Sequence, residues 1–241
     1  MGDQNSQGWM AEPRREGPQA VSIYGGKGGI GKTTDAFELA YMLGCIGPTL
    51  LINGDKKQED GGATALVQSM KIEAPFELAE TDSVTELAKI RQLRQFRFVI
   101  TDNAPQRDEG MIREAANADL TIVPTPPKRL DSKAVMASTR TYLAGTNYRL
   151  HITKVDHISK SRARNMKTSL RDLGVPVFDG WMRMYQAHEM LDGYPVFHPK
   201  AVAADAAAAK AAEDAYLFGD EVLSLLGLPF KVPRDLVGAD R

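Results

Sequence analysis

The segment from Val21 to Thr34 reads Val-Ser-Ile-Tyr-Gly-Gly-Lys-Gly-Gly-Ile-Gly-Lys-Thr-Thr. Within it, Gly26 to Thr33 matches the pattern G-x-x-x-x-G-K-[ST] in full. A short apolar run precedes the match and a helix-compatible stretch, residues 35–43, follows it, which is the context that a phosphate-binding loop requires. Glycines let backbone N–H groups converge on phosphate oxygens, and the start of a helix adds further amides. The alternative is a glycine-rich turn with chance lysines.

This loop predicts ATP and Mg²⁺ as ligands. We expect the Lys32 ammonium to reach the β- and γ-phosphates and the Thr33 hydroxyl to ligate Mg²⁺. The other loop residues expected to contact the nucleotide are Gly26, Lys27, Gly28, Gly29, Ile30, Gly31 and Thr34.

Lys27 is a second lysine in the loop, at a position that the general pattern leaves open. With it the loop reads K-G-G-x-G-K-[ST], and the chain resembles the ParA/MinD family of deviant Walker-A ATPases, most of all its short ParA-type partition proteins. The resemblance implies that Lys27 reaches across a nucleotide-sandwich homodimer to the phosphates of the partner chain and is catalytic together with Lys32. A solvated loop lysine is the alternative.

Composition favours one soluble α/β domain. The chain has 241 residues, 43% of them hydrophobic, and a net charge of −1, which suits a single sizeable core. No apolar run has the length of a membrane span and residues 1–19 lack the core of a signal peptide, so we expect a cytoplasmic protein without a membrane partner. Cys45 is the only cysteine, which excludes internal disulfides and cysteine-rich metal sites.

The order of segments predicts the architecture. Residues 1–19 are expected to form a mobile tail, 20–230 the P-loop ATPase domain, and 231–241 a C-terminal tail. After the first strand, apolar runs of strand length occur at 48–53, 96–101, 120–123, 150–155 and 175–178. Helical segments between them predict a mostly parallel, doubly wound sheet flanked by helices. The family resemblance implies that this sheet has the deviant Walker-A form of the P-loop NTPase fold. Residues 201–226 read as a helix docked on the domain, broken near Gly219.

Two acids follow apolar strands. Asp102 ends the run Phe-Val-Ile-Thr-Asp and is expected to hold Mg²⁺ through water. Asp55 follows Asn53 and Gly54, where members of the family usually carry Asp-x-Asp. The resemblance makes Asp55 the candidate for orienting the attacking water or holding Mg²⁺, whereas Asn53 departs from the pattern and puts the rate of hydrolysis in doubt. A turn-forming Asp55 is the alternative.

A late segment, residues 178–196, also resembles the family, in which a loop here helps to frame the adenine base. Carried onto this chain, that role falls on Met182 and Arg183, with a plain surface loop as the alternative. The four histidines show no metal-ligand spacing.

A basic cluster follows the run at 150–155. If residues 159–173 are helical, Arg164, Lys167 and Arg171 share one face, and such a stripe can neutralise DNA phosphates without reading bases. An ordinary solvated helix face is the alternative. The candidate DNA-binding residues are Lys160, Arg162, Arg164, Lys167 and Arg171.

Three function classes compete. A ParA-type ATPase that binds nonspecific double-stranded DNA, works with a ParB-like adaptor and associates with the nucleoid explains the lysine pair and the basic stripe together. A ParA-like ATPase for another cytoplasmic cargo or a conjugation complex is the runner-up to this first class. A metabolic or electron-transfer relative, such as the nitrogenase iron protein, needs cluster-ligating cysteines, which Cys45 alone does not supply. A MinD-like membrane-positioning ATPase needs a basic amphipathic C-terminal helix, which residues 222–241 do not resemble.

Overall fold

The computed structural model describes residues 17–234 except 56–61, 106–108, 129–138, 140, 142 and 190–192. The strands are β1 (Gln19–Ile23), β2 (Thr49–Asn53), β3 (Glu77–Glu80), β4 (Phe98–Asp102), β5 (Leu120–Thr125), β6 (Tyr148–Val155) and β7 (Val177–Arg183). The helices are α1 (Lys32–Gly44), α2 (Gly62–Ser69), α3 (Val84–Ile90), α4 (Glu109–Ala116), α6 (Lys160–Asp172), the 3-10 helix η2 (Gln186–Glu189), α7 (Pro199–Ala204) and α8 (Ala206–Leu225).

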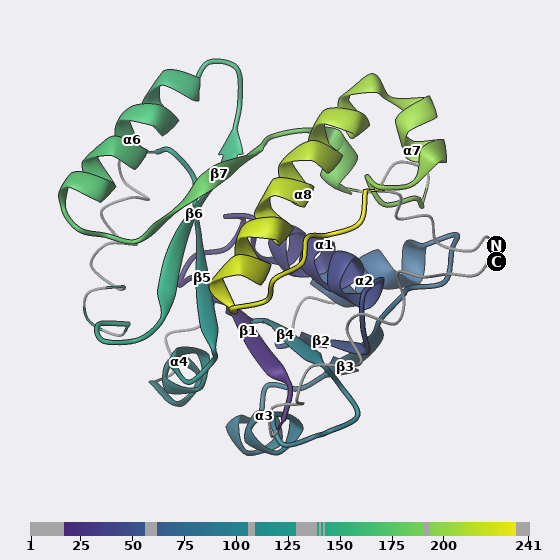
Figure 1. Ribbon diagram of the computed structural model, residues 1–241, viewed down its shortest axis with the longest axis vertical. Helices are drawn as coiled ribbons and strands as arrows, with labels where there is room; N and C mark the ends of the chain where they lie inside the picture. The colour runs from purple at the N-terminus through teal and green to yellow at the C-terminus, as the bar shows by residue number, and fades with distance from the viewer. Residues whose placement is uncertain are drawn as a thin grey trace.

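All seven strands form one sheet in the order β3-β2-β4-β1-β5-β6-β7. The strand pairings of the described residues are all parallel, and helices flank the sheet (Figure 1). The predicted α/β class, with a parallel, doubly wound sheet flanked by helices, is confirmed.

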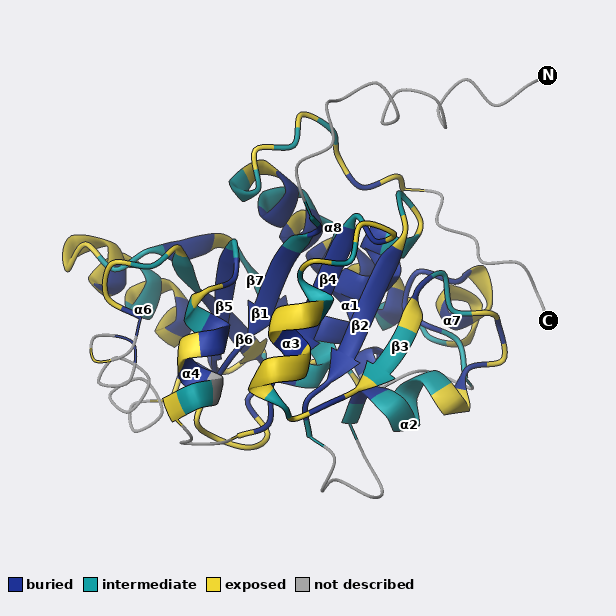
Figure 2. Ribbon diagram, turned by 90° about the horizontal axis from the view of Figure 1, so that it is seen from below, coloured by how far each residue is buried: buried dark blue, intermediate teal, exposed yellow. Residues whose placement is uncertain are grey.

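Successive side chains of the strands enter different apolar layers, as a sheet covered on both faces requires. In β4, Phe98 and Ile100 belong to the layer that contains α1 and α8, whereas Val99 packs with α3. In β6, Leu150 and Ile152 belong to the layer that contains α4 and α6. The central strands β1, β2, β4 and β5 are accordingly among the most deeply buried elements of the molecule, whereas the edge strand β3 is not (Figure 2).

Two strands differ from the sequence prediction. The edge strand β3 was not expected, because its four residues, Glu-Leu-Ala-Glu, contain only two apolar side chains. β7 extends to Arg183, so the segment expected to be a loop around Met182 and Arg183 is instead a strand. Its interior glycine and charged residues hid its strand character, because such residues are depleted in strands.

The C-terminal helical segment breaks at Asp205 and not near Gly219. The Asp205 side chain accepts a hydrogen bond from the Ala207 N–H at 2.8 Å and so caps α8, which is the usual role of aspartate at a helix start. Gly219 lies inside α8, where a Cβ atom would come within 2.9 Å of both Met42 and Val232. The glycine therefore serves close packing, and α8 is docked on the domain as expected.

The folded domain extends beyond the expected boundary at residue 230. Val232 is buried in the same apolar layer as α1, and its N–H donates to the Asp220 carboxylate at 2.8 Å. At the other end β1 begins at Gln19. Residues 1–16 and 235–241, which make up most of the two expected tails, lie outside the described residues.

A glycine at the end of α1 provides a test of the packing. At Gly44 a Cβ atom would lie 2.3 Å from the carbonyl oxygen of Pro75, and backbone atoms cannot move aside as a flexible side chain can. Gly44→Ala should therefore lower the free energy of unfolding by about 1–3 kcal/mol in chemical denaturation. The control is Gly180→Ala, at a strand position where a Cβ atom would meet nothing within 4 Å. Equal denaturation midpoints for the two variants would contradict the close approach.

Candidate functional site

The carboxyl ends of β1, β2 and β4 lie in one row. Ile23 of β1 and Asn53 of β2 both align with Asp102 of β4. The loop of residues 24–31 leaves this row from β1, and Gly54 and Asp55 leave it from β2. Ligands of open α/β sheets bind beyond the carboxyl ends of the strands, so this edge is the candidate site.

The phosphate loop presents backbone groups at this edge. Residues 26–29 are exposed, whereas Ile30 is buried and anchors the loop. Gly29 and Gly31 have φ values of 70° and 101°, a conformation that favours glycine. Gly31 precedes α1 without a side-chain cap, and the amides of the first helical turn have no acceptor within the helix. The loop thus offers N–H donors to an anion, as the sequence predicted.

Lys32 is held inside the site. Only 7% of the residue is exposed, and its Nζ donates to the Lys27 carbonyl oxygen at 3.1 Å. Burial lowers the pKa of Lys32 below its ordinary value, while the nearby carboxylates of Asp102 and Asp55 act in the opposite direction. The structure therefore brings together three predicted site residues. Lys27 lies in the exposed part of the loop, and its action on a partner chain stays a prediction.

Asp102 is a buried carboxyl group at the end of β4. Burial raises the pKa of Asp102 to about 6, against the opposing effects of the Thr33 hydroxyl, which hydrogen-bonds to it, and of Lys32. The folded protein keeps this proton at pH values at which the unfolded chain has lost it. The group's contribution to stability is thus greatest below about pH 4 and is lost as the pH rises through about 6.

The oxygen atoms around Asp102 fit a magnesium ion. Asp102 Oδ1 is buried and has no hydrogen-bond partner among the described residues, and buried polar atoms normally have one. The Thr33 hydroxyl and the Asp55 carboxylate add further oxygens of the kind that Mg²⁺ prefers. The part of the chain described here contains no group of three or more His, Cys, Asp or Glu side chains that could hold a metal, so phosphate oxygens and water would have to complete the coordination.

Asp55 reaches the site through a tight turn after β2. The Gly54 N–H donates to the Asp102 carbonyl oxygen at 2.9 Å, and a Cβ atom at Gly54 would meet that same oxygen at 2.9 Å. Glycine therefore allows the backbone of this turn to lie directly against the end of β4. The turn places Asp55 near Lys32 and Asp102.

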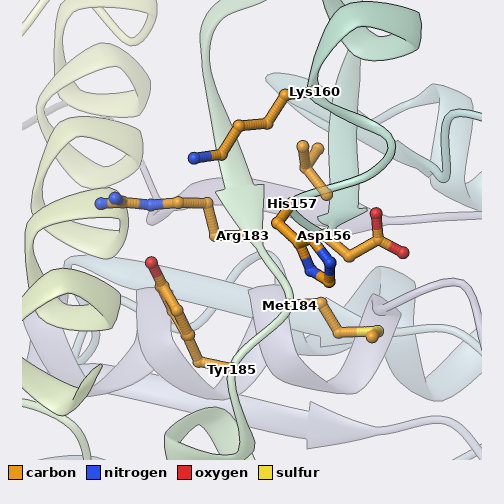
Figure 3. Close-up of a pocket in the computed structure, with 7 residues that line it drawn as sticks. Asp156, His157, Lys160, Arg183, Met184 and Tyr185 are labelled. Atoms are coloured by element: carbon orange, nitrogen blue, oxygen red, sulfur yellow. The ribbon is translucent and has the colours of Figure 1, made fainter.

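A pocket of about 300 Å³ lies beyond the ends of β6 and β7. The same strand, β6, contacts the phosphate loop through Thr153, whose hydroxyl donates to the Ile30 carbonyl oxygen at 2.7 Å. Lys154, the next residue, has a φ of 54°, a rare value for a side chain other than glycine. The pocket is lined by Val155, Asp156, His157, Lys160, Arg183, Met184 and Tyr185 (Figure 3).

The pocket revises several sequence predictions. Arg183 lines the pocket, and its contact with the base stays a prediction. Met182 is 3% exposed and belongs to the apolar core, because neighbouring strand residues point to opposite faces. Met182 thus offers no surface to a base. Lys160, predicted to bind DNA, lies here beside Arg183 (Figure 3). Sequence reasoning missed Asp156, His157 and Tyr185, whose positions just after β6 and β7 were the available signal.

Arg183 is fixed by α8. Its Nε lies 2.7 Å from Asp214 Oδ2, and a second guanidinium nitrogen lies 2.7 Å from Asp214 Oδ1. Such a two-point pair holds the planar guanidinium in one orientation. The side chain therefore forms a rigid wall of the pocket.

The basic stripe lies on α6, which is helical as predicted. Arg162 and Arg164 are exposed. Lys167 Nζ donates to the Asp179 carbonyl oxygen at 2.7 Å, and Arg171 forms an ion pair with the Asp179 carboxylate. Asp179 of β7 is thus a second acid beside the cluster, in addition to Asp156, and part of the stripe is engaged within the molecule.

Two buried acid–histidine pairs fasten α1 to the rest of the domain. Asp35 Oδ2 lies 2.7 Å from His151 Nδ1 in β6, and Glu38 Oε1 lies 2.5 Å from His188 Nδ1 in η2. Burial raises the pKa of Glu38, with His188 opposing it. Burial lowers the pKa of His188, but the facing Glu38 outweighs this effect and the net shift is upward. These pairs hold the helix that begins at the phosphate loop.

Comparisons with known proteins agree with this geometry. No family model matches the chain. The "maintenance of carboxysome distribution protein A" of Gloeobacter kilaueensis is 31% identical over 180 residues, which cover 73% of this chain and 82% of that protein. A plasmid partition protein of Borrelia burgdorferi bound to AMPPNP has a TM-score of 0.59 at 13% identity, covering 86% of this chain and 99% of that chain. MinD from Aquifex aeolicus has a TM-score of 0.62 at 13% identity, covering 86% and 97%.

The two solved structures show that the fold is shared, and the more similar Gloeobacter sequence extends the relationship to the family. The phosphate loop, with Lys27 and Lys32 in the pattern K-G-G-x-G-K-[ST], agrees with both findings. The chain belongs to the ParA/MinD family of deviant Walker-A ATPases.

Proposed function

We propose that this protein is a ParA-type ATPase that positions a cargo through cycles of ATP-dependent dimerisation. The observation that carries the proposal is the row of groups at the ends of β1, β2 and β4. It combines a buried lysine, a second lysine in the exposed loop, and two carboxylates close to the buried lysine.

The chain's own residues suit binding and hydrolysis of a nucleoside triphosphate. Amides of the loop and of the first turn of α1 would bind phosphate oxygens, and Lys32 would hold the β- and γ-phosphates. Thr33 and Asp102 would hold Mg²⁺, which when bound neutralises charge on the phosphate oxygens. Asp55 would orient the attacking water, since its turn directs it toward Lys32.

The pocket beyond β6 and β7 suits the adenine base. It lies at the end of β6, the strand whose Thr153 hydroxyl donates to Ile30 of the phosphate loop, and Tyr185 and Arg183 offer an aromatic ring and a planar guanidinium. Flat groups of this kind stack on bases. Lys160 lies in the same pocket, so we assign it to the nucleotide and leave α6 beyond it for other partners.

The proposal has two forms, which differ in the cargo that the ATPase positions. The exposed arginines of α6 favour nonspecific DNA as the surface on which the dimer acts, with a ParB-like adaptor linking it to a plasmid or chromosome. The Gloeobacter relative is named for carboxysome distribution, which favours a cargo other than DNA with the same ATPase cycle. A MinD-like membrane role has less support, because α8 buries most of its apolar residues in the core, with Leu217 as an exposed exception. No described helix has the length and apolar character to cross a membrane.

Lys32→Ala tests the nucleotide site. Removing the buried ammonium should weaken ATP binding at least tenfold and abolish hydrolysis, because Lys32 is the cation fixed within the loop. Titration with a fluorescent ATP analogue and phosphate release measure the two effects. The control is Lys89→Ala, an exposed lysine on α3. Unchanged affinity and turnover in the Lys32 variant would rule out the assignment.

Lys27→Ala tests the dimer. If Lys27 acts on the nucleotide of the partner chain, the variant should bind ATP within about threefold of the parent protein but lose ATP-dependent dimerisation or hydrolysis. Analytical ultracentrifugation with ATP, with ADP and without nucleotide measures the assembly. A normal ATP-dependent dimer with normal turnover would show that Lys27 is only a solvated loop residue.

The DNA form of the proposal predicts salt-sensitive binding by the ATP-bound protein. Arg162→Glu with Arg164→Glu should weaken binding to double-stranded DNA and lower the salt slope by about 2, while ATP affinity stays the same. Lys89→Glu with Lys231→Glu is the control, since both lysines are exposed elsewhere on the surface. Mobility shifts across a salt series measure the effect. Absence of DNA binding in every nucleotide state would favour the other cargo.

A further inference from the structure

Asn53 occupies the last position of β2, where the family resemblance places an acid. It is 2% exposed, and its side-chain amide makes two hydrogen bonds. The amide oxygen accepts from the Asp55 N–H at 3.0 Å, and the amide nitrogen donates to the Thr64 hydroxyl oxygen at 2.8 Å. The residue thus links the turn after β2 to α2.

The direction of these hydrogen bonds is fixed by a further hydrogen bond, from Thr64 to Glu80. The Thr64 hydroxyl donates to the carboxylate of Glu80, at the end of β3, and an ionised carboxylate can only accept. The hydroxyl proton of Thr64 is therefore already donated to Glu80, so the Thr64 oxygen accepts a hydrogen bond from the amide N–H of Asn53. The amide oxygen of Asn53 is then oriented to accept the hydrogen bond from the Asp55 N–H. Only a side chain with both a donor and an acceptor satisfies this arrangement.

We infer that Asn53 is a positioning residue, whose amide fixes the turn that carries Asp55 to the phosphate loop. The inference rests on the proposed ATP hydrolysis. The backbone on either side is already fixed, because the Gly54 N–H binds the Asp102 carbonyl and the Thr81 N–H binds the Asn53 carbonyl. The amide of Asn53 adds the contact that determines the course of the chain at Asp55 itself.

This role explains why an amide replaces an acid here. A carboxylate at position 53 would face the oxygen of Thr64 without a proton to share, and it would lie in a buried site close to Glu80. An acceptor that loses its donor in a buried site is costly. A carboxylate would still accept the Asp55 N–H, but the link from the turn to Thr64 of α2 would be lost, and Asp55 would be held less firmly beside Lys32. Binding of ATP would persist, because the phosphate loop and Lys32 belong to β1 and α1.

The experiment compares Asn53→Asp with the parent protein. The kcat for ATP hydrolysis should fall about tenfold, while the dissociation constants for ATP and ADP change less than about twofold. A fall in kcat at unchanged nucleotide affinity separates loss of positioning from a general loss of structure, which would also weaken nucleotide binding.

Substitutions at Thr64 provide an independent test. Thr64→Val removes the hydroxyl and should lower kcat in the same way, whereas Thr64→Ser keeps it and should restore the rate. Ser69→Ala, at an exposed position of the same helix, is the control and should have no effect. These variants keep the test intact if Asn53→Asp does not fold.

The outcomes separate the inference from the proposed function. A kcat in Asn53→Asp equal to or above that of the parent protein, or equal rates for Thr64→Val and Thr64→Ser, would overturn the positioning role. A parent protein that does not hydrolyse ATP at all would instead overturn the proposed function, and this is measured before any variant.

Discussion

The parallel alignment of β1 and β2 with β4 is the constraint on which the candidate site depends. Parallel strands bring their carboxyl ends to one edge, so the phosphate loop, the Asp55 turn and Asp102 meet there without a further connecting element. The apolar layers on both faces fix the register, since a shift of one residue would exchange the two faces of a strand. The chemistry at the edge is therefore specified by the packing of the core.

The site carries charge where burial makes charge costly. Lys32 and Asp102 are both largely buried, and burial is the largest influence on the pKa of each. A ligand that brings phosphate and a cation to this edge adds a partner of opposite charge to each group. The fold thus supplies an acceptor for a cation in advance, since Asp102 Oδ1 has no hydrogen-bond partner among the described residues.

The sequence predicted those elements whose signal is local. The loop pattern located Lys32 and Thr33, and the apolar run before Asp102 located the acid that the structure places beside them. The β3 edge strand and the strand character of residues 179–183 were missed, because their pairing depends on neighbours distant in sequence. The pocket was found only in part, since Lys160 and Arg183 are 23 positions apart and meet through the packing of two elements. The contact of Asp179 with the basic stripe was missed for the same reason, because it joins β7 to α6 through packing.

The two acid–histidine pairs beneath the phosphate loop have an evolutionary consequence. Loss of one member would leave a buried polar or charged group without its partner, a change far more damaging than replacing both members together. Asp35 and His151 lie 116 positions apart in the sequence, and Glu38 and His188 lie 150 apart. Selection on these contacts acts on pairs, so relatives that replace the acid on α1 should also replace the facing histidine. Covariation between these distant positions would then record the attachment of α1 to β6 and η2.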